Sequence, residues 1–303
     1  MRLYVAGSGG MLGEAFHRMA RNDDVIRFTD KDVNEPWLDF LDFRDFDAYR
    51  ADVTGFRPDV LIHLGAHTSL EYCENEPDDA YLTNTLSVEH AATIANELDV
   101  PLVYISTAGI FDGAADLYDD WSQPNPLGVY ARSKYTGELT VQQRVARYYI
   151  CRAGWMMGGG VKKDKKFIAK IGKQLADGAT ELNIVDDKLG TPTLTWDFAR
   201  NLRALLDTQY YGLYNMVCGG VTGRLEVATE MVRLLGLQSE VRINAVPSSY
   251  FATEFFAPRP ENERLINLKL RLRGLDLMRE WPEALKVYLE ADWAQHVAQA
   301  RAA

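Results

Sequence analysis

A tyrosine and a lysine four positions apart are the residues of this chain best suited to chemistry. Tyr130 and Lys134 end the stretch Asn125 to Lys134, where we expect a helix to begin. Residues four apart on a helix lie on one face, one turn from each other. An ammonium group near a phenol favours the phenolate and lowers the tyrosine pKa, so that the phenol can exchange a proton near neutral pH. We therefore predict that Tyr130 is a general acid.

A hydroxyl side chain is expected beside this pair. The apolar run Leu102 to Ser106 predicts a buried strand, and Thr107 follows at its carboxyl end. Ligands of open α/β sheets bind outside the carboxyl ends of the strands. We predict that Thr107, Tyr130 and Lys134 form one catalytic set.

A glycine-rich turn near the start of the chain predicts a dinucleotide site. A short strand, Leu3 to Ala6, runs into Gly7-Ser-Gly-Gly-Met-Leu-Gly13, and helical character follows. In such a turn the first glycine permits a sharp bend, the second lets backbone amides approach a pyrophosphate, and the third allows close helix packing. The helix N-terminus then faces the phosphates. The predicted cofactor-binding residues of this turn are Gly7, Gly10, Met11, Leu12 and Gly13.

Residues after the next strands would complete the cofactor site. Asp30 follows the strand Val25 to Thr29, where a carboxylate can accept hydrogen bonds from a ribose hydroxyl. Lys31 could instead pair with a 2'-phosphate. We favour NADH on balance, with NADPH accepted.

Two further pairs belong to the same predicted site. Asp42 and Phe43 suit the amino group and ring face of adenine, although an exposed Asp beside a packed Phe is an equal interpretation. Gly65 and Ala66 end the buried strand that begins near Arg57, and their small side chains let a cofactor lie close.

Composition excludes several classes of partner. A net charge of -10 argues against a nucleic-acid or anionic-membrane surface. Cys73, Cys151 and Cys218 are scattered, without metal-ligand spacing, and we interpret them as reduced thiols. His63 and His67 also lack ligand spacing, so we expect structural roles and no metal. With no signal peptide or membrane-length apolar run in the sequence, we expect a cytoplasmic protein.

The order of predicted elements indicates the fold. Strands and helices alternate to about residue 155, which predicts an α/β, Rossmann-type, doubly wound parallel sheet with a smaller C-terminal substrate lobe. We place the dinucleotide-binding domain at 1–155 and the substrate lobe mainly at 156–303. Beyond the alternating part, the basic run from Lys162 to Lys166 could meet a substrate diphosphate, but is more often a solvated helix start. We also expect an amphipathic helix at 84–98, an acidic lid at 116–125 and one terminal helix at 281–296.

These motifs together resemble the extended short-chain dehydrogenase/reductases, and most closely the dTDP-4-dehydrorhamnose reductase family. The resemblance rests on the glycine turn and the catalytic set, and on further motifs that keep the family's order over nearly the whole chain. Those motifs are Ala66-His67-Thr68, Asn125-Pro-Leu with Val129-Tyr130, Arg152 with Trp155, Gly190-Thr-Pro-Thr193, and Arg259-Pro260 with Leu265. It implies that a segment around 189–218 returns to the first domain.

The resemblance also implies a reaction. NAD(P)H would reduce the C4 keto group of a nucleotide-diphospho-4-keto-6-deoxy sugar. Tyr130 would protonate the developing alkoxide, Lys134 would lower its pKa and hold the nicotinamide ribose, and Thr107 would bond the reacting oxygen. We assign Leu70, Trp155 and Arg259 to substrate binding, Trp155 as a wall of the sugar pocket.

Two departures from the family keep alternatives open. Ala108-Gly109 stands where the family usually has Asp-Tyr, so the sugar could differ. Ala15 stands where the family has the first glutamate of a metal site at a dimer contact, so we expect no metal, and a homodimer stays open as the assembly. The alternatives in function are a nucleotide-sugar epimerase on the same scaffold and a non-catalytic, nucleotide-binding regulatory subunit.

Overall fold

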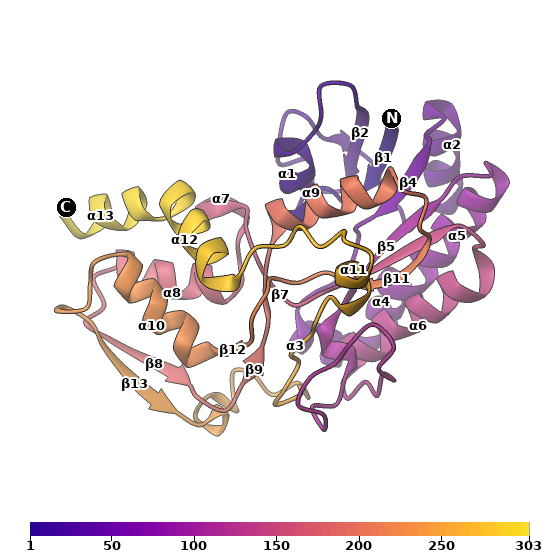
Figure 1. Ribbon diagram of the computed structural model, residues 1–303. Helices are drawn as coiled ribbons and strands as arrows, with labels where there is room; N and C mark the ends of the chain where they lie inside the picture. The colour runs from indigo at the N-terminus through magenta and orange to yellow at the C-terminus, as the bar shows by residue number, and fades with distance from the viewer. Residues whose placement is uncertain (303) are drawn as a thin grey trace.

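A seven-stranded, wholly parallel sheet forms the centre of the protein. The computed structural model describes residues 1–302 (Figure 1). The strand order is β3-β2-β1-β4-β5-β6-β11, in which the chain reverses direction across the sheet between β1 and β4. The strands are β1 Arg2–Ala6, β2 Val25–Asp30, β3 Asp39–Phe40, β4 Val60–His63, β5 Leu102–Thr107, β6 Tyr148–Ala153 and β11 Gly212–Asn215. The predicted Rossmann-type fold is confirmed.

Both faces of the sheet are buried, which explains the continuous apolar runs of its strands. Successive side chains alternate between two cores: Leu3 and Val5 belong to one, and Tyr4 and Ala6 to the other. The first core lies under α1 Met11–Arg18 and α9 Thr195–Leu206 and continues into the second lobe. The second core lies under α2 Phe46–Phe56, α5 Ser87–Glu97 and α6 Val129–Arg144.

Short helices lie near the carboxyl ends of the strands. They are α3 Leu70–Asn75, α4 Pro77–Tyr81, the π-helix η1 Leu82–Leu86, the 3-10 helix η2 Ala108–Ile110 and α11 Leu268–Leu272. The helix expected at 84–98 therefore begins in a π-helical turn that runs on from α4 and continues as α5. Such turns occur often near functional sites.

The second lobe packs helices and small two-stranded sheets beside the first (Figure 1). Its helices are α7 Gly160–Lys163, α8 Phe167–Ala176, α10 Arg224–Leu234, η3 Ser248–Phe251, α12 Trp281–Asp292 and α13 Ala294–Ala302. Its strands are β7 Trp155–Met157, β8 Glu181–Val185, β9 Leu189–Gly190, β10 Pro192–Leu194, β12 Thr222–Gly223 and β13 Arg242–Val246. These strands pair as β10 with β7, β12 with β9, and β13 with β8. Between them, α9 and β11 lie with the first lobe, β11 pairing with β6.

The structure adds detail to two sequence predictions. The segment 116–125, expected to be an acidic lid, is packed against the rest of the protein: Tyr118 stacks on Phe111 with ring centroids 4.1 Å apart, and the Asp120 carboxylate accepts hydrogen bonds from the amides of Asn215 and Lys269. The terminal helix is two helices, interrupted at the buried Trp293. In both cases long-range packing decided the local structure.

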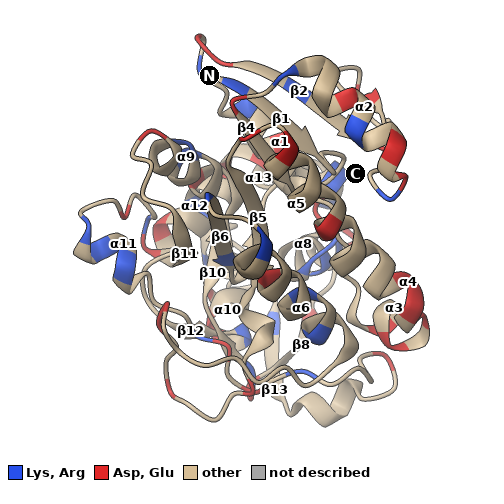
Figure 2. Ribbon diagram, turned by 90° about the vertical axis from the view of Figure 1, so that its right-hand side faces the viewer, with Lys and Arg blue, Asp and Glu red and all other residues tan. Residues whose placement is uncertain are grey.

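Charge on the surface is mixed. Figure 2 shows acidic residues gathered on α3 and α4, whereas basic residues are scattered over several helices, including α11 and α6. None of the helices within residues 1–302 combines the length and apolar character needed to cross a bilayer.

Candidate functional site

The carboxyl end of β5 places Thr107 beside α6, as predicted. Thr107 caps η2, since its Oγ1 accepts a hydrogen bond from the Gly109 amide at 3.1 Å. The Thr107 hydroxyl also lies close enough to the Tyr130 phenol to lower the phenol's pKa. The first helical turn of α6 is fixed by the Val129 amide, which donates to Glu74 at 2.6 Å. The two hydroxyl groups therefore face the same space at the edge of the sheet.

The electrostatics of Tyr130 differ from the sequence prediction. Burial raises the pKa of Tyr130 to about 12, and the hydrogen bond with Thr107 only partly opposes this rise. The Lys134 ammonium lies over the Tyr104 ring, 4.2 Å from its centroid, rather than against the phenol. The expectation that Lys134 lowers the pKa of Tyr130 in the protein alone is therefore wrong. The phenol keeps its proton at neutral pH, which is the state that a general acid needs.

Lys134 is only 4% exposed. Burial lowers its pKa to about 7, while the negative charge of Glu138 raises it. Glu138 lies one turn further along the same face of α6 and is itself fully buried. Its two carboxylate oxygens accept hydrogen bonds from Arg152 of β6 at 2.9 and 2.8 Å. Tyr130, Lys134 and Glu138 thus form a row of phenol, ammonium and carboxylate along one face of α6.

The glycine turn has the geometry expected of a pyrophosphate cradle. Gly7 adopts φ of +79°, which favours glycine. A Cβ on Gly13 would lie 2.0 Å from the Ser8 carbonyl oxygen, so only glycine allows this helix to pack so closely. Gly10, the N-cap of α1, gives its helix no side-chain cap, and a Cβ there would meet open space. The first amides of α1 are therefore suited to donate hydrogen bonds to phosphate oxygens.

The other predicted cofactor residues lie around this turn. The Asp30 carboxylate accepts hydrogen bonds from the amides of Gly9 at 2.8 Å and Asp32 at 2.9 Å, and Lys31 is exposed beside it. The Phe43 ring packs against Gly65 after β4. Met11 and Ala66 are partly exposed, whereas Leu12 points into the core, so Leu12 can offer only its backbone.

Asp42 and the two histidines singled out in the sequence make polar contacts that the sequence did not reveal. The Asp42 carboxylate pairs with Arg44, whose Nη2 lies 2.6 Å away, and this pairing lowers the pKa of Asp42. His63 is buried between the Tyr49 hydroxyl and the Ser87 hydroxyl, which suits the structural role expected of it. His67 Nε2 lies 2.7 Å from Asp79. Within residues 1–302, no cluster of acidic, histidine and cysteine side chains is suited to hold a metal ion.

The substrate side contains two charged residues that the sequence analysis missed. Trp155 Nε1 donates a hydrogen bond to Glu263 Oε1 at 2.5 Å, and the Arg224 guanidinium stacks on the Trp155 ring 3.8 Å from its centroid. Arg259 pairs with Glu71. Leu70 opens α3 and is partly exposed. No local motif singles out a lone arginine at a helix start or a lone glutamate in a loop.

The basic run connects the two lobes. Lys162 donates to the Asn34 carbonyl at 3.1 Å, Lys163 to the Gly9 carbonyl at 3.2 Å, and Lys166 to the Thr68 carbonyl at 3.0 Å. Lys162 and Lys165 have the exposure expected of a solvated helix start, whereas Lys163 is buried and Lys166 is partly buried. The run therefore fixes the substrate lobe against the glycine turn.

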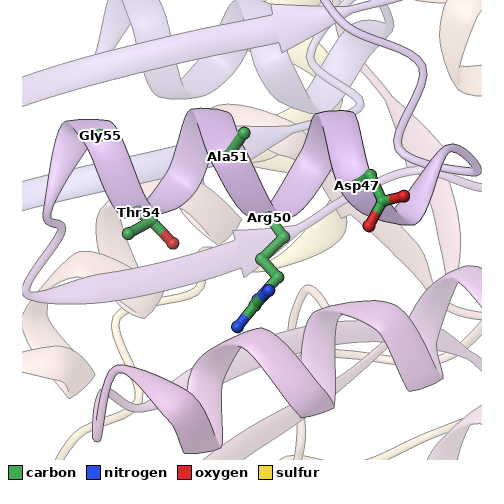
Figure 3. Close-up of a pocket in the computed structure, with 5 residues that line it drawn as sticks. All are labelled: Asp47, Arg50, Ala51, Thr54 and Gly55. Carbon is green, nitrogen blue, oxygen red and sulfur yellow. The ribbon is translucent and has the colours of Figure 1, made fainter.

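A depression on the outer surface lies away from this site. It runs along α2 and is lined by exposed parts of that helix (Figure 3). Arg50 points from α2 toward the neighbouring helix, where it pairs with Glu97 of α5. The depression contains none of the candidate residues.

Comparison with known proteins shows to which family this chain is related. A family model described as the RmlD substrate binding domain matches residues 1–293. The chain belongs to this family. The dTDP-4-dehydrorhamnose reductase of Escherichia coli (strain K12) is 31% identical over 300 residues, which cover 94% of this chain and 96% of that protein.

Solved structures of the family superpose closely on the present one. A dTDP-4-dehydrorhamnose reductase from Clostridium acetobutylicum ATCC 824 is 29% identical, with a TM-score of 0.86 over 96% of this chain and 99% of the other. The dTDP-4-dehydrorhamnose reductase of Bacillus anthracis str. Ames, solved in complex with NADP, is 28% identical with the same TM-score and coverage. The family's fold therefore extends through both lobes of this chain.

The buried ammonium of Lys134 generates a prediction about stability. Because its pKa falls to about 7 on folding, from an ordinary value of 10.5, the folded protein binds fewer protons than the unfolded chain between these values. The contribution of Lys134 to the free energy of unfolding must therefore rise with pH between about 7 and 10.5. We expect Lys134→Met to be more stable than the parent at pH 7, and this advantage to shrink by about 2–3 kcal/mol at pH 9.5. Urea unfolding of both proteins at both pH values measures it.

A matched control is Lys173→Met on the exposed face of α8. It should show the same difference from the parent at both pH values. A pH-independent difference for Lys134→Met as well would contradict the inferred titration of Lys134.

Proposed function

We propose that this protein reduces the C4 keto group of a nucleotide-diphospho-4-keto-6-deoxy sugar with NAD(P)H. The observation that carries the proposal is the placement of the Thr107 hydroxyl beside a protonated Tyr130 at the carboxyl edge of the sheet. The uncapped start of α1 lies at the same edge of the sheet, where the strand order reverses. Membership of the reductase family supports the same reaction.

The cofactor site fits a dinucleotide. The glycine turn leaves space and unpaired amides at the start of α1, and the small Gly65 and Ala66 border it. When bound there, the reduced dinucleotide supplies the hydride. The amides of α1 hold the pyrophosphate, and Lys134 is one turn from Tyr130, within the reach needed to hold a ribose hydroxyl.

Side chains of the protein donate the proton to the substrate oxygen and stabilise the negative charge that develops during reduction. Thr107 donates a hydrogen bond to the carbonyl oxygen that becomes an alkoxide, and Tyr130 delivers the proton to it. The charge of Glu138 keeps Lys134 closer to its protonated form than burial alone would allow. An ammonium drawn toward the phenol stabilises the phenolate left after proton transfer. Arg152 fixes Glu138 and thereby the whole row.

The alternatives differ from this proposal in identifiable ways. An epimerase would leave the cofactor unchanged overall, and a regulatory subunit would bind nucleotide without turnover. The complete set of Thr107, Tyr130 and Lys134 favours a reductase over a regulatory subunit. The homodimer and the cytoplasmic location stay predictions from sequence.

Replacement of the proposed acid tests the function. Tyr130→Phe removes the hydroxyl with little change of shape, so it should keep dinucleotide binding and lose about 10²–10⁴-fold in kcat. Turnover of dTDP-4-keto-6-deoxy sugars is followed by cofactor absorbance, and binding by thermal shift. Tyr135→Phe, five residues further along the same helix, is the matched control. Near-normal turnover by Tyr130→Phe would remove this residue from the mechanism.

For the cofactor we propose a preference for NADH, with NADPH accepted. The negative charge of Asp30 beside the glycine turn disfavours a 2'-phosphate, and Lys31 opposes it only when turned inward. Asp30→Asn should shift the ratio of kcat/KM toward NADPH by about tenfold, since one lost charge repulsion is worth about 1.4 kcal/mol at this range. Asp23→Asn, an exposed change of equal charge, should leave the ratio unchanged. A strong parental preference for NADPH that Asp30→Asn does not alter would contradict the proposal.

A further inference from the structure

One carboxyl group in the substrate site has no part in the chemistry described so far. Glu263 lies in the loop that begins at Arg259, and Trp155 holds its Oε1. A Cβ built on Gly109 would lie 3.8 Å from Glu263 Oε2 and 3.5 Å from Thr107 Oγ1. The second carboxylate oxygen therefore borders the space in front of the group that meets the reacting oxygen.

The residue at position 109 leaves this space open. Gly109 has no side chain between Thr107 and Glu263, and a methyl group there would make ordinary contacts with both. A larger side chain would occupy the volume that separates the two oxygens. Glu263 and Thr107 can therefore contact one small molecule from two sides.

Positive charges around Glu263 stabilise its ionised form without using its free oxygen. Burial raises the pKa of Glu263 above its ordinary value, and the Trp155 hydrogen bond and the charges of Arg224 and Arg259 only partly oppose this rise. Arg224 stacks on the rings of Trp155 and Phe167. Arg259 donates to Glu71 and to the Phe255 carbonyl.

The Glu263 carboxylate can accept more hydrogen bonds than the one that Trp155 donates to it. An ionised carboxyl group has about four lone-pair sites, and a site built around such an acceptor discriminates against a ligand that brings no donor. The cost arises because the partly buried oxygen loses water and gains nothing in return. A sugar lying between Thr107 and Trp155 would therefore bind best with a hydrogen-bond donor directed at Oε2.

We propose that Glu263 determines substrate specificity: its Oε2 accepts a hydrogen bond from a hydroxyl or ammonium group on the ring carbon next to the reacting carbonyl. The inference rests on the proposed function, because it takes the keto group of a nucleotide sugar to lie against Thr107. It adds the recognition of a neighbouring ring substituent, which the reduction itself does not require.

The test compares three nucleotide-linked 4-keto sugars that differ only at the ring carbon next to the carbonyl. This carbon carries a hydroxyl group in the first sugar, an amino group in the second and only hydrogen in the third, the deoxy sugar. The parent protein should prefer the hydroxyl or the amino sugar over the deoxy sugar by about 10–100-fold in kcat/KM, as expected for a hydrogen bond to a charged group. The better of the two identifies the natural donor.

Glu263→Gln is the decisive variant. If its amide oxygen keeps the Trp155 hydrogen bond, its NH₂ group faces the sugar and replaces an acceptor by a donor. The preference for donor-bearing sugars should then fall to within about threefold of unity, while kcat/KM for the deoxy sugar changes little. Glu261→Gln, an exposed carboxylate in the same loop, is the control and should keep the parental preference.

The outcomes separate this inference from the proposed function. If the parent reduces all three sugars equally, or if Glu263→Gln weakens all three equally, Glu263 serves only to support Trp155 and the inference is overturned, although the reductase function stands. If the parent reduces none of them, the proposed function and the inference both fail. Titration with a nucleoside diphosphate should give the same affinity for parent and variant, and a changed affinity would likewise point to a structural role.

Discussion

The burial of a charged row along one face of α6 is the constraint on which the site depends. An ammonium and a carboxylate are costly to remove from water, and they persist here because Glu138 accepts two hydrogen bonds from Arg152 and also faces Lys134. Breaking such a buried pair typically costs about 3–5 kcal/mol, because it leaves one charge uncompensated. The pairing therefore fixes α6 against β6. It also fixes the positions of Tyr130 and Lys134 relative to Thr107 on the adjacent strand.

Sequence reasoning succeeded where local rules decide the structure. Helical spacing placed Tyr130 and Lys134 on one face, and the end of an apolar strand placed Thr107 beside them. The glycine spacing likewise predicted the turn, since Gly7 needs a positive φ and Gly13 needs close packing. Each of these features depends on few neighbours, so that residue type and spacing suffice to predict it.

The rest depended on contacts between distant parts of the chain. The raised pKa of Tyr130 follows from burial, which no local pattern reports, and its direction is opposite to the one expected from Lys134, which lies over the Tyr104 ring. Lys163 reaches the Gly9 carbonyl across more than half of the sequence. Glu263 enters the site only because a late loop folds back against Trp155. These residues could be identified only once the two lobes were seen together.

The central claim is that this site transfers a hydride to a sugar carbonyl, and isotope transfer tests it most directly. The protein is incubated with a reduced nicotinamide cofactor deuterated at its transferable position and with a dTDP-4-keto-6-deoxy sugar. The account predicts one oxidised cofactor per product and one deuterium on C4 of that product, measured by mass spectrometry and NMR. An isomerised sugar without deuterium and with the cofactor still reduced would contradict it in favour of an epimerase. Nucleotide binding without any turnover would contradict it in favour of a regulatory subunit.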